Sequence, residues 1–264
     1  MADRAITRAV LLCAGFGTRL RPLTDNTPKP LVKVAGRRIV DYLMDQLQTW
    51  PSLQHIAVVI NDAQPEQWQA WASDWKPELD AAGIGLSLLN DGVTEPEQAL
   101  GAVRDLHFAL DQVGTDSPAL VAAGDSIFRL WLDPLREAFE RSGTPHALAL
   151  YEDQPAHLRQ TSILQFSEDG SVAGLLHGVT TDSPQWASPA CYALTASALS
   201  HVTEYLDNEG DPDSLGAFLG YLAERETVRV ARGPERSGMR VHINTPAAKA
   251  QAESVLRNAP VLLA

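Results

Sequence analysis

The first 150 residues alternate short apolar runs with segments of helical periodicity. The runs predict buried strands at Ala9–Cys13, His55–Ile60, Leu86–Leu89, Ala119–Ala123 and Ala147–Tyr151. Helical spacing recurs in two segments, at Val40, Leu43 and Leu47 and at Leu100, Val103, Leu106 and Leu110. A third helix is expected over Trp131–Arg141, where Asp133 and Pro134 suit its first turn. This order predicts parallel strands and helical crossovers in an open α/β sheet with flanking helices.

The second half of the chain has a different texture. Ser162–Phe166 and Val172–Leu176 flank Glu168-Asp-Gly-Ser and predict a hairpin. Three further strands are expected at Ala187–Leu194, Thr227–Val230 and Arg240–Ile243, and three helices at Ala196–Leu206, Leu215–Arg225 and Pro246–Leu256. The hairpin makes the sheet a mixed one, mostly parallel. The acidic tract Glu204–Asp213 is expected to be a solvated loop and helix cap, and no long linker divides residues 1–264.

Composition limits the class of protein. A content of 45% hydrophobic and 20% charged residues is typical of a globular domain. No apolar stretch is long enough for a membrane span, and Met-Ala-Asp-Arg does not begin a signal peptide. Two cysteines without metal spacing favour a reducing, cytoplasmic location. The formal charge of -12 argues against nucleic acid as a partner.

One basic segment stands out on this acidic chain. Between residues 19 and 38 lie six cations, Arg19, Arg21, Lys29, Lys33, Arg37 and Arg38, with Asp25 as the one acidic residue. The segment follows the first apolar run and two glycines, Gly15 and Gly17. Exposed backbone N–H groups, the Thr18 hydroxyl, the Arg19 guanidinium and the Lys29 ammonium could together bind an anion, best a polyphosphate. The alternative is a solvated surface turn.

Two familiar phosphate loops do not match this segment. A Walker A loop needs Lys followed by Ser or Thr after its last glycine, whereas Arg19 and Leu20 follow Thr18. A dinucleotide fingerprint needs a third small residue where Leu20 stands. The segment is therefore a loop of another kind.

The stretches Leu12-Cys-Ala-Gly-Phe-Gly-Thr-Arg-Leu-Arg-Pro-Leu-Thr, Thr27-Pro-Lys-Pro-Leu-Val and Val34-Ala-Gly-Arg-Arg-Ile-Val resemble the signature of sugar-nucleotide nucleotidyltransferases. That family, which includes glucose-1-phosphate thymidylyltransferases, joins a nucleoside triphosphate to a phosphomonoester, usually a sugar 1-phosphate, and releases pyrophosphate with Mg²⁺. The resemblance implies one Rossmann-like domain, with a nucleotide half to about residue 150 and an acceptor half after it. It implies nucleotide contacts at Ala14, Gly15, Gly17 and Thr18. It also implies that Arg19 and Lys29 are the catalytic cations.

The metal site is expected at Asp125, which follows an apolar strand in Ala122-Ala-Gly-Asp and offers a hard oxygen ligand. A turn-forming aspartate is the alternative. The family's second metal ligand lies in a segment like Trp-x-Asp-Ile-Gly-Thr-Pro, and here Arg240-Val-His-Ile-Asn-Thr-Pro places His242 at the aspartate position. Imidazole suits Mg²⁺ poorly, so Asn244, water or Mn²⁺ with His242 are the options. A purely structural histidine is equally compatible.

The acceptor half departs from the family pattern. Leu176-His-Gly-Val replaces Glu-Lys-Pro, and Ala190-Cys-Tyr-Ala replaces Gly-x-Tyr, so that Cys191 stands where a glycine would approach the sugar. The segment Glu97-Gln-Ala-Leu-Gly-Ala-Val resembles the one that packs against the base, which implies base contacts from Gln98 and Gly101. Gln98 and Gly101 could equally begin a core-facing helix.

Three functions remain open at this point. The first is nucleotidyl transfer to a sugar 1-phosphate. The second is a nucleotide-binding or regulatory module that no longer catalyses, and the third is a cytidylyltransferase for an alcohol phosphate such as phosphocholine. The base, the acceptor and any homo-oligomer are not fixed by the sequence.

Overall fold

The protein is built around one central β-sheet, and the computed structural model describes residues 4–159 and 161–258. The strands follow the order β10-β9-β11-β8-β12-β6-β1-β4-β5, and β13 also pairs with β8. They are β1 (Arg8–Leu12), β4 (His55–Ile60), β5 (Gly85–Asn90), β6 (Ala119–Ala123), β8 (His146–Glu152), β9 (Ser162–Phe166), β10 (Val172–His177), β11 (Gln185–Ser188), β12 (Cys191–Leu194) and β13 (Arg229–Arg232). Two small antiparallel sheets join β2 (Lys33–Val34) to β3 (Arg37–Arg38) and β7 (Ser126–Phe128) to β14 (Arg240–His242).

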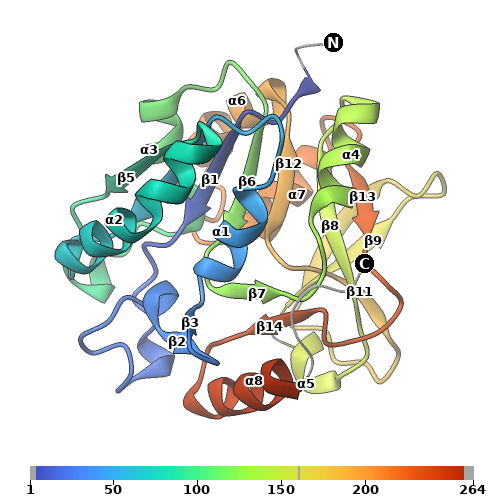
Figure 1. Cartoon of the computed structure of the whole chain (residues 1–264). Coiled ribbons are helices and arrows are strands. Elements are labelled where there is room, and N and C mark those ends of the chain that lie inside the picture. Colours follow the sequence, from blue (N-terminus) through green and yellow to red (C-terminus); the bar gives the residue numbers. More distant parts are fainter. Residues whose placement is uncertain (1–3, 160, 259–264) are drawn as a thin grey trace.

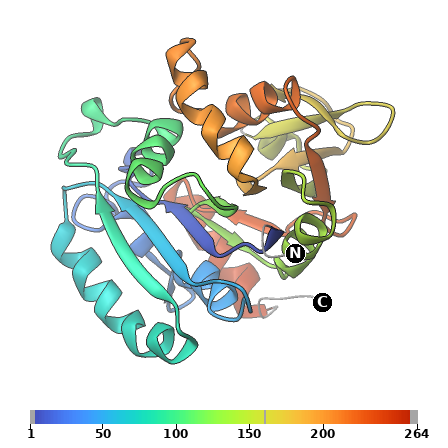
Figure 2. The ribbon, with the colours of Figure 1, turned by 90° about the horizontal axis from the view of Figure 1, so that it is seen from above.

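Helices cover both faces of the sheet, as Figure 2 shows. They are α1 (Asp41–Leu47), α2 (Pro65–Ala82), α3 (Ala102–Val113), α4 (Asp133–Ser142), α5 (Pro155–Leu158), α6 (Ala196–Asp207), α7 (Leu215–Ala223) and α8 (Pro246–Asn258). Side chains of α1, α2 and α4 share one core, and those of α3, α6 and α7 share the core on the opposite face. No helix of the described part of the chain is both long and apolar enough to span a membrane.

Strand β1 shows how the sequence produces two cores from one strand. Successive side chains point to opposite faces, so Ala9 and Leu11 lie in the core under α1 and α2, while Val10 and Leu12 lie in the core under α3. All four are buried. A strand buried on both faces needs an uninterrupted apolar run, which is the pattern from which it was predicted.

The open mixed α/β sheet predicted from the sequence is confirmed. Strands β4 and β6 have the predicted bounds, and β1 pairs with both of them in parallel. Strand β5 extends this parallel part at the edge beyond β4. Because parallel strands end at the same edge, the loops after β1 and β6 lie side by side, where α/β sheets bind their ligands.

The strand predicted over 187–194 is wrong, because it is two strands. Strand β11 pairs with β8 and β9, whereas β12 lies antiparallel between β6 and β8. Pro189 and Ala190 separate them: proline has no N–H for a ladder, and Ala190 has a positive φ of 54°. The apolar run therefore turns at residues 189–190 and changes its place in the sheet.

Other predicted elements are confirmed with small shifts. The hairpin β9–β10 is present on the opposite side of the molecule from α2 (Figure 1). Helices α4, α6, α7 and α8 lie within two residues of their predicted bounds, and β13 begins two residues later than predicted. Helix α2 is absent from the predicted set, although the spacing of Trp68, Trp71 and Trp75 is helical.

Helix α8 joins the C-terminal region to the segment that follows the glycine loop. A third apolar cluster contains Ala252 and Leu256 of α8 together with Leu20, Val34 and Ile243. Leu20 belongs to the 3₁₀ turn η2 (Thr18–Leu20). Its side chain packs into this cluster and so fixes the loop that carries Arg19.

A buried carboxylate fixes helix α2 against α1. Asp41 Oδ1 accepts hydrogen bonds from Trp71 Nε1 at 2.8 Å and from Trp75 Nε1 at 2.9 Å. Asp41 is 9% exposed, and both indoles are buried. Each indole N–H would lack a partner without this carboxylate.

We therefore expect Asp41→Ala to lower the free energy of unfolding by about 2 to 4 kcal/mol, because two buried donors lose their acceptor. Urea unfolding followed by tryptophan fluorescence measures this. Asp45→Ala is the matched control, since Asp45 lies one turn later on α1 and makes a partly exposed ion pair with Arg37; about 1 kcal/mol or less is expected there. Equal losses in the two variants would contradict the assigned role.

Candidate active site

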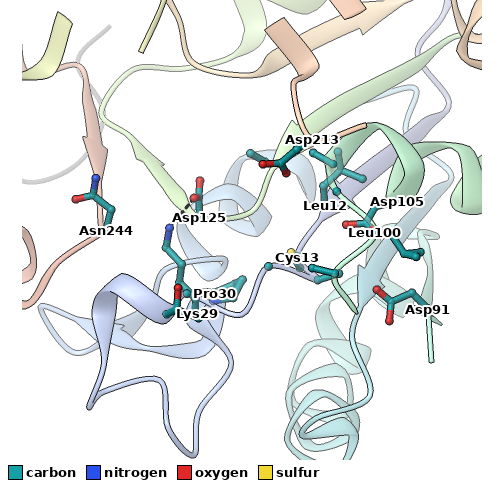
Figure 3. Close-up of a pocket in the computed structure, with 18 of the residues that line it drawn as sticks. Leu12, Cys13, Lys29, Pro30, Asp91, Leu100, Asp105, Asp125, Asp213 and Asn244 are labelled. Atoms are coloured by element: carbon teal, nitrogen blue, oxygen red, sulfur yellow. Dashed lines mark hydrogen bonds and ion pairs between the residues drawn. The ribbon is translucent and has the colours of Figure 1, made fainter. Parts of the chain in front are cut away.

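A cavity of about 290 Å³ opens at the carboxyl ends of β1 and β6. It is lined by the loop after β1, by the 3₁₀ turn η3 (Lys29–Leu31), by the start of α3 and by Asp125 after β6 (Figure 3). Asn244, after β14, also lines it. The cavity therefore gathers segments that are more than 200 residues apart in sequence.

The glycine loop is held close to Lys29. Gly17 has a φ of +62°, and a Cβ at this position would lie 2.8 Å from Lys29 Cβ. The Gly17 carbonyl accepts a hydrogen bond from Thr24 Oγ1 at 2.9 Å, and the Ala14 carbonyl accepts one from Asn61 Nδ2 at 2.7 Å. Gly17 thus provides both the left-handed backbone conformation and the space that the lysine side chain occupies. Gly15, by contrast, has no atom near the position of a Cβ.

Lys29 and Asp125 form the polar floor of the cavity. Lys29 Nζ lies 2.7 Å from Asp125 Oδ2, and Lys29 is only 8% exposed. Burial opposes ionisation of Asp125, but the interactions of this carboxyl with His242 and Lys29 outweigh burial and hold its pKa well below the usual range. Asp125 is therefore an anionic oxygen donor at the edge of the cavity.

His242 reaches Asp125 through the small sheet formed by β7 and β14. The register places His242 opposite Ser126, and His242 Nε2 lies 3.0 Å from Asp125 Oδ2. Burial lowers the pKa of His242, and a neutral imidazole can still donate from Nε2 to the carboxylate. In this structure His242 thus holds Asp125 in place. Its role as a metal ligand stays a prediction.

The other oxygen of Asp125 is held by a network that the sequence analysis missed. Ser126 Oγ donates to Asp125 Oδ1 at 3.2 Å, and Arg240 Nε donates to Ser126 Oγ at 2.9 Å. Ser126 is 1% exposed. Ser126 and Arg240 are 114 positions apart in the sequence, and the pairing of β14 with β7 brings them together.

Gly124 sets how closely β1 and β6 approach below the site. A Cβ at Gly124 would lie 2.2 Å from Cys13 Sγ, and the thiol is buried. Cys13 thus fills the space that a side chain at Gly124 would need.

This contact predicts a compensating pair of substitutions. Gly124→Ala is expected to lower the free energy of unfolding by about 1 to 3 kcal/mol through overpacking. Cys13→Ala in the same chain removes the sulfur and should restore most of that loss, which equilibrium unfolding in urea would measure. If the double variant were no more stable than Gly124→Ala alone, the contact would not be the cause.

Gly101 and Gln98 have different positions relative to the cavity. Gly101 lines it with a φ of +94°, and a Cβ there would lie 2.6 Å from the Pro212 carbonyl oxygen. Gln98 ends the 3₁₀ turn η4 (Pro96–Gln98), is exposed and does not line the cavity. Base recognition by Gln98 remains a prediction that this geometry does not support.

The side of the cavity at α3 is acidic. Asp91, Asp105 and Asp213 all line it. Asp213 is exposed in the loop between α6 and α7, as expected of a solvated loop, and this loop also brings it to the edge of the cavity. The sequence does contain a signal for Asp105. It is an acidic residue between two apolar positions of a helix, Val103 and Leu106, which are both buried.

The altered acceptor motifs lie apart from this cavity. Cys191 is fully buried in a hydrophobic core, so its thiol does not contact a ligand there. Leu176 and His177 are exposed at the end of β10. Of the predicted site residues, those that line the cavity are Ala14, Gly15, Gly17, Thr18, Arg19, Lys29, Gly101, Asp125 and Asn244.

The fold and this cavity together define a nucleotidyltransferase. The family model described as nucleotidyl transferase matches residues 8–230, and the chain belongs to this family. The resemblance noted from the glycine loop and the Pro-Lys-Pro segment is therefore confirmed, and the protein is an enzyme of the sugar-nucleotide nucleotidyltransferase type.

Individual relatives add detail. The chain is 26% identical to an N-acetylmuramate alpha-1-phosphate uridylyltransferase from Caulobacter vibrioides over 95% of this chain and 97% of that one. A solved structure from Bacillus anthracis, assigned as a glucose-1-phosphate thymidylyltransferase, has a TM-score of 0.78 at 17% identity, covering 97% and 96% of the two chains. The CTP:phosphocholine cytidylyltransferase from Streptococcus pneumoniae has a TM-score of 0.68 at 16% identity, covering 95% and 99%. At these identities the two structures support the fold alone.

Proposed function

We propose that this protein transfers a nucleoside monophosphate from a nucleoside triphosphate to a sugar 1-phosphate and releases pyrophosphate. The observation that carries the proposal is the Lys29–Asp125 pair, 2.7 Å apart, beneath a glycine loop that also carries Arg19. This arrangement supports the proposal, because the two cations and the backbone of the glycine loop line one cavity and could together bind a triphosphate.

The reaction needs no nucleophile from the protein. A phosphate oxygen of the sugar 1-phosphate attacks the α-phosphorus, a new P–O bond forms, and the bond to the β-phosphate oxygen breaks. The electron pair leaves with pyrophosphate. The chain aligns the two anions through the glycine loop and Arg19, and Lys29 stabilises charge that develops on the phosphates. His242, Ser126 and Arg240 keep Asp125 fixed while this happens.

The donor set around Asp125 fits Mg²⁺. This ion prefers oxygen and is usually held by one or two carboxylates, substrate phosphates and water rather than by a protein cage. Asp125 supplies one anionic oxygen donor, and Asn244 lines the same cavity. When bound, Mg²⁺ would neutralise triphosphate charge. Mn²⁺, which accepts nitrogen more readily, is the alternative if His242 joins the ligands.

A pyrophosphate-release assay tests the proposal. Five triphosphates (UTP, dTTP, GTP, CTP and ATP) are crossed with glucose 1-phosphate, mannose 1-phosphate, N-acetylmuramate 1-phosphate and phosphocholine, with Mg²⁺ or Mn²⁺. UTP with N-acetylmuramate 1-phosphate is the first pair to try, because that relative matches over nearly the whole of both chains. Turnover with a sugar 1-phosphate is expected. Turnover with phosphocholine alone, or nucleotide binding without turnover, would overturn the proposal.

The setting of this activity is also part of the proposal. Both cysteines are free and buried, which suits a reducing compartment, and we infer that the protein works in the cytoplasm on nucleotide and sugar phosphate pools.

A further inference from the structure

Asp105 is a buried acid that the proposed reaction does not use. It lies in the first turns of α3, lines the cavity and is 6% exposed. Its Oδ1 is buried and accepts no hydrogen bond. A buried acceptor without a partner destabilises a protein, so such a group is retained only where something else needs it.

Lys29 and the carboxylates of Asp91 and Asp105 lie on different sides of the cavity, as Figure 3 shows. Lys29 lies on one side, with Asp125 and Asn244, while Asp91, Leu100 and Asp105 lie on the other. Leu12 and Cys13 lie between them. Among the described residues, the acidic side contains no group of three or more His, Cys, Asp or Glu placed to hold a metal ion. Its carboxylates can only accept hydrogen bonds when ionised.

The positions of these charges favour one orientation for a nucleotide in the cavity, with its triphosphate near Lys29 and Arg19 and its nucleoside at the acidic side. Resting on the proposed function, we propose that Asp105 determines base specificity by accepting a hydrogen bond from a ring N–H of the base. Uracil and thymine at N3, and guanine at N1, carry this N–H. Cytosine at N3 and adenine at N1 present a lone pair there instead.

A carboxylate facing a lone pair leaves two acceptors opposed without a proton between them. A site built around one hydrogen-bonding group rejects ligands that cannot complete the bond. We expect UTP or GTP to bind on the order of 10- to 100-fold more tightly than CTP or ATP. The enzyme then handles the uridylyl, thymidylyl or guanylyl group and excludes the cytidylyl group.

The surroundings of Asp105 should make the proposed discrimination between bases depend on pH. Burial, followed by the charges of Asp91 and Asp213, raises the pKa of Asp105 to about 7. The Cys13 thiol also interacts with Asp105, but burial raises the pKa of this thiol, so the thiol stays neutral. A protonated Asp105 can donate to the cytosine N3 lone pair. Discrimination against CTP should therefore be largest above pH 7 and should weaken as the pH falls below it.

The same shift makes Asp105 unfavourable for stability. Because its pKa is higher in the folded chain than in the unfolded one, stability falls as the pH rises from about 4 to about 7. Asp105→Asn removes this charge without changing the shape of the side chain. It should raise Tm at pH 8 and also reduce discrimination, since an amide can pair with uracil or with cytosine.

Calorimetric binding of UTP, GTP, CTP and ATP to the full chain with Mg²⁺, at pH 6 and pH 8, tests this inference. Wild type should discriminate at pH 8 and less at pH 6, and Asp105→Asn should bind all four with affinities within about 3-fold. Asp111→Asn is the control, because Asp111 lies on the same helix but is exposed; it should behave as wild type.

Other outcomes overturn the inference. An equal loss of affinity for all four nucleotides in Asp105→Asn would assign Asp105 to the ribose, and unchanged selectivity would remove it from recognition. If the variant does not fold, the wild-type pH series decides alone, and pH-independent selectivity contradicts the role. Failure to bind any nucleotide would instead contradict the proposed function, which keeps the two failures distinguishable.

Discussion

Replacing Lys29 by alanine is expected to lower kcat about 1,000-fold, because it removes a desolvated positive charge from the site of phosphoryl charge development. Lys29 is 8% exposed and bound to Asp125, so its ammonium is held in place before substrate arrives. The variant also removes the ammonium that pairs with Asp125 Oδ2 at 2.7 Å. Pyrophosphate release under saturating substrates measures the effect.

Lys76→Ala is the matched control for Lys29. Lys76 is exposed on α2 and pairs with Asp80 in the next turn. Its loss should change kcat by less than 2-fold, since exposed i,i+4 pairs contribute little. A Lys29→Ala enzyme that retained most of its turnover would exclude this lysine from the reaction.

The second large effect concerns Asp125. We expect Asp125→Asn to lower kcat about 100- to 1,000-fold and to remove most of the stimulation by Mg²⁺, because the anionic oxygen is lost while the side-chain shape is kept. Titration of MgCl₂ against pyrophosphate release is the measurement. Asp169→Asn, in the exposed turn between β9 and β10, serves as the control. Wild-type Mg²⁺ activation in Asp125→Asn would contradict the metal assignment.

Much of the nucleotide half could be predicted from local pattern. Strands β4 and β6 are apolar runs bounded by polar residues, and the sequence defines their ends because both faces are buried. The glycine loop can be predicted from its composition, since glycines and cations follow directly after β1. The first aspartate after β6 is then placed beside the loop by the parallel order of the strands.

Features that depend on pairing across the chain could not be predicted. The contact of His242 with Asp125 requires β14 to pair with β7, a short pairing that no local pattern indicates. The break at Pro189 and Ala190 carries a proline signal, but the change of neighbours in the sheet does not follow from it. Asp105 is similar: its place in α3 could be predicted, whereas its unsatisfied oxygen appears only once the cavity is formed.

The position of β12 has a consequence for how the protein is made. This strand follows β8 along the chain, yet it lies between β6 and β8 in the sheet. On the ribosome, β6 can pair with β1 but lacks its second neighbour, β12, until residue 194 has left the exit tunnel. The nascent chain cannot complete the sheet around β6 before that point, and an exchange of the later part of the chain between relatives would have to carry this strand along with a matching partner.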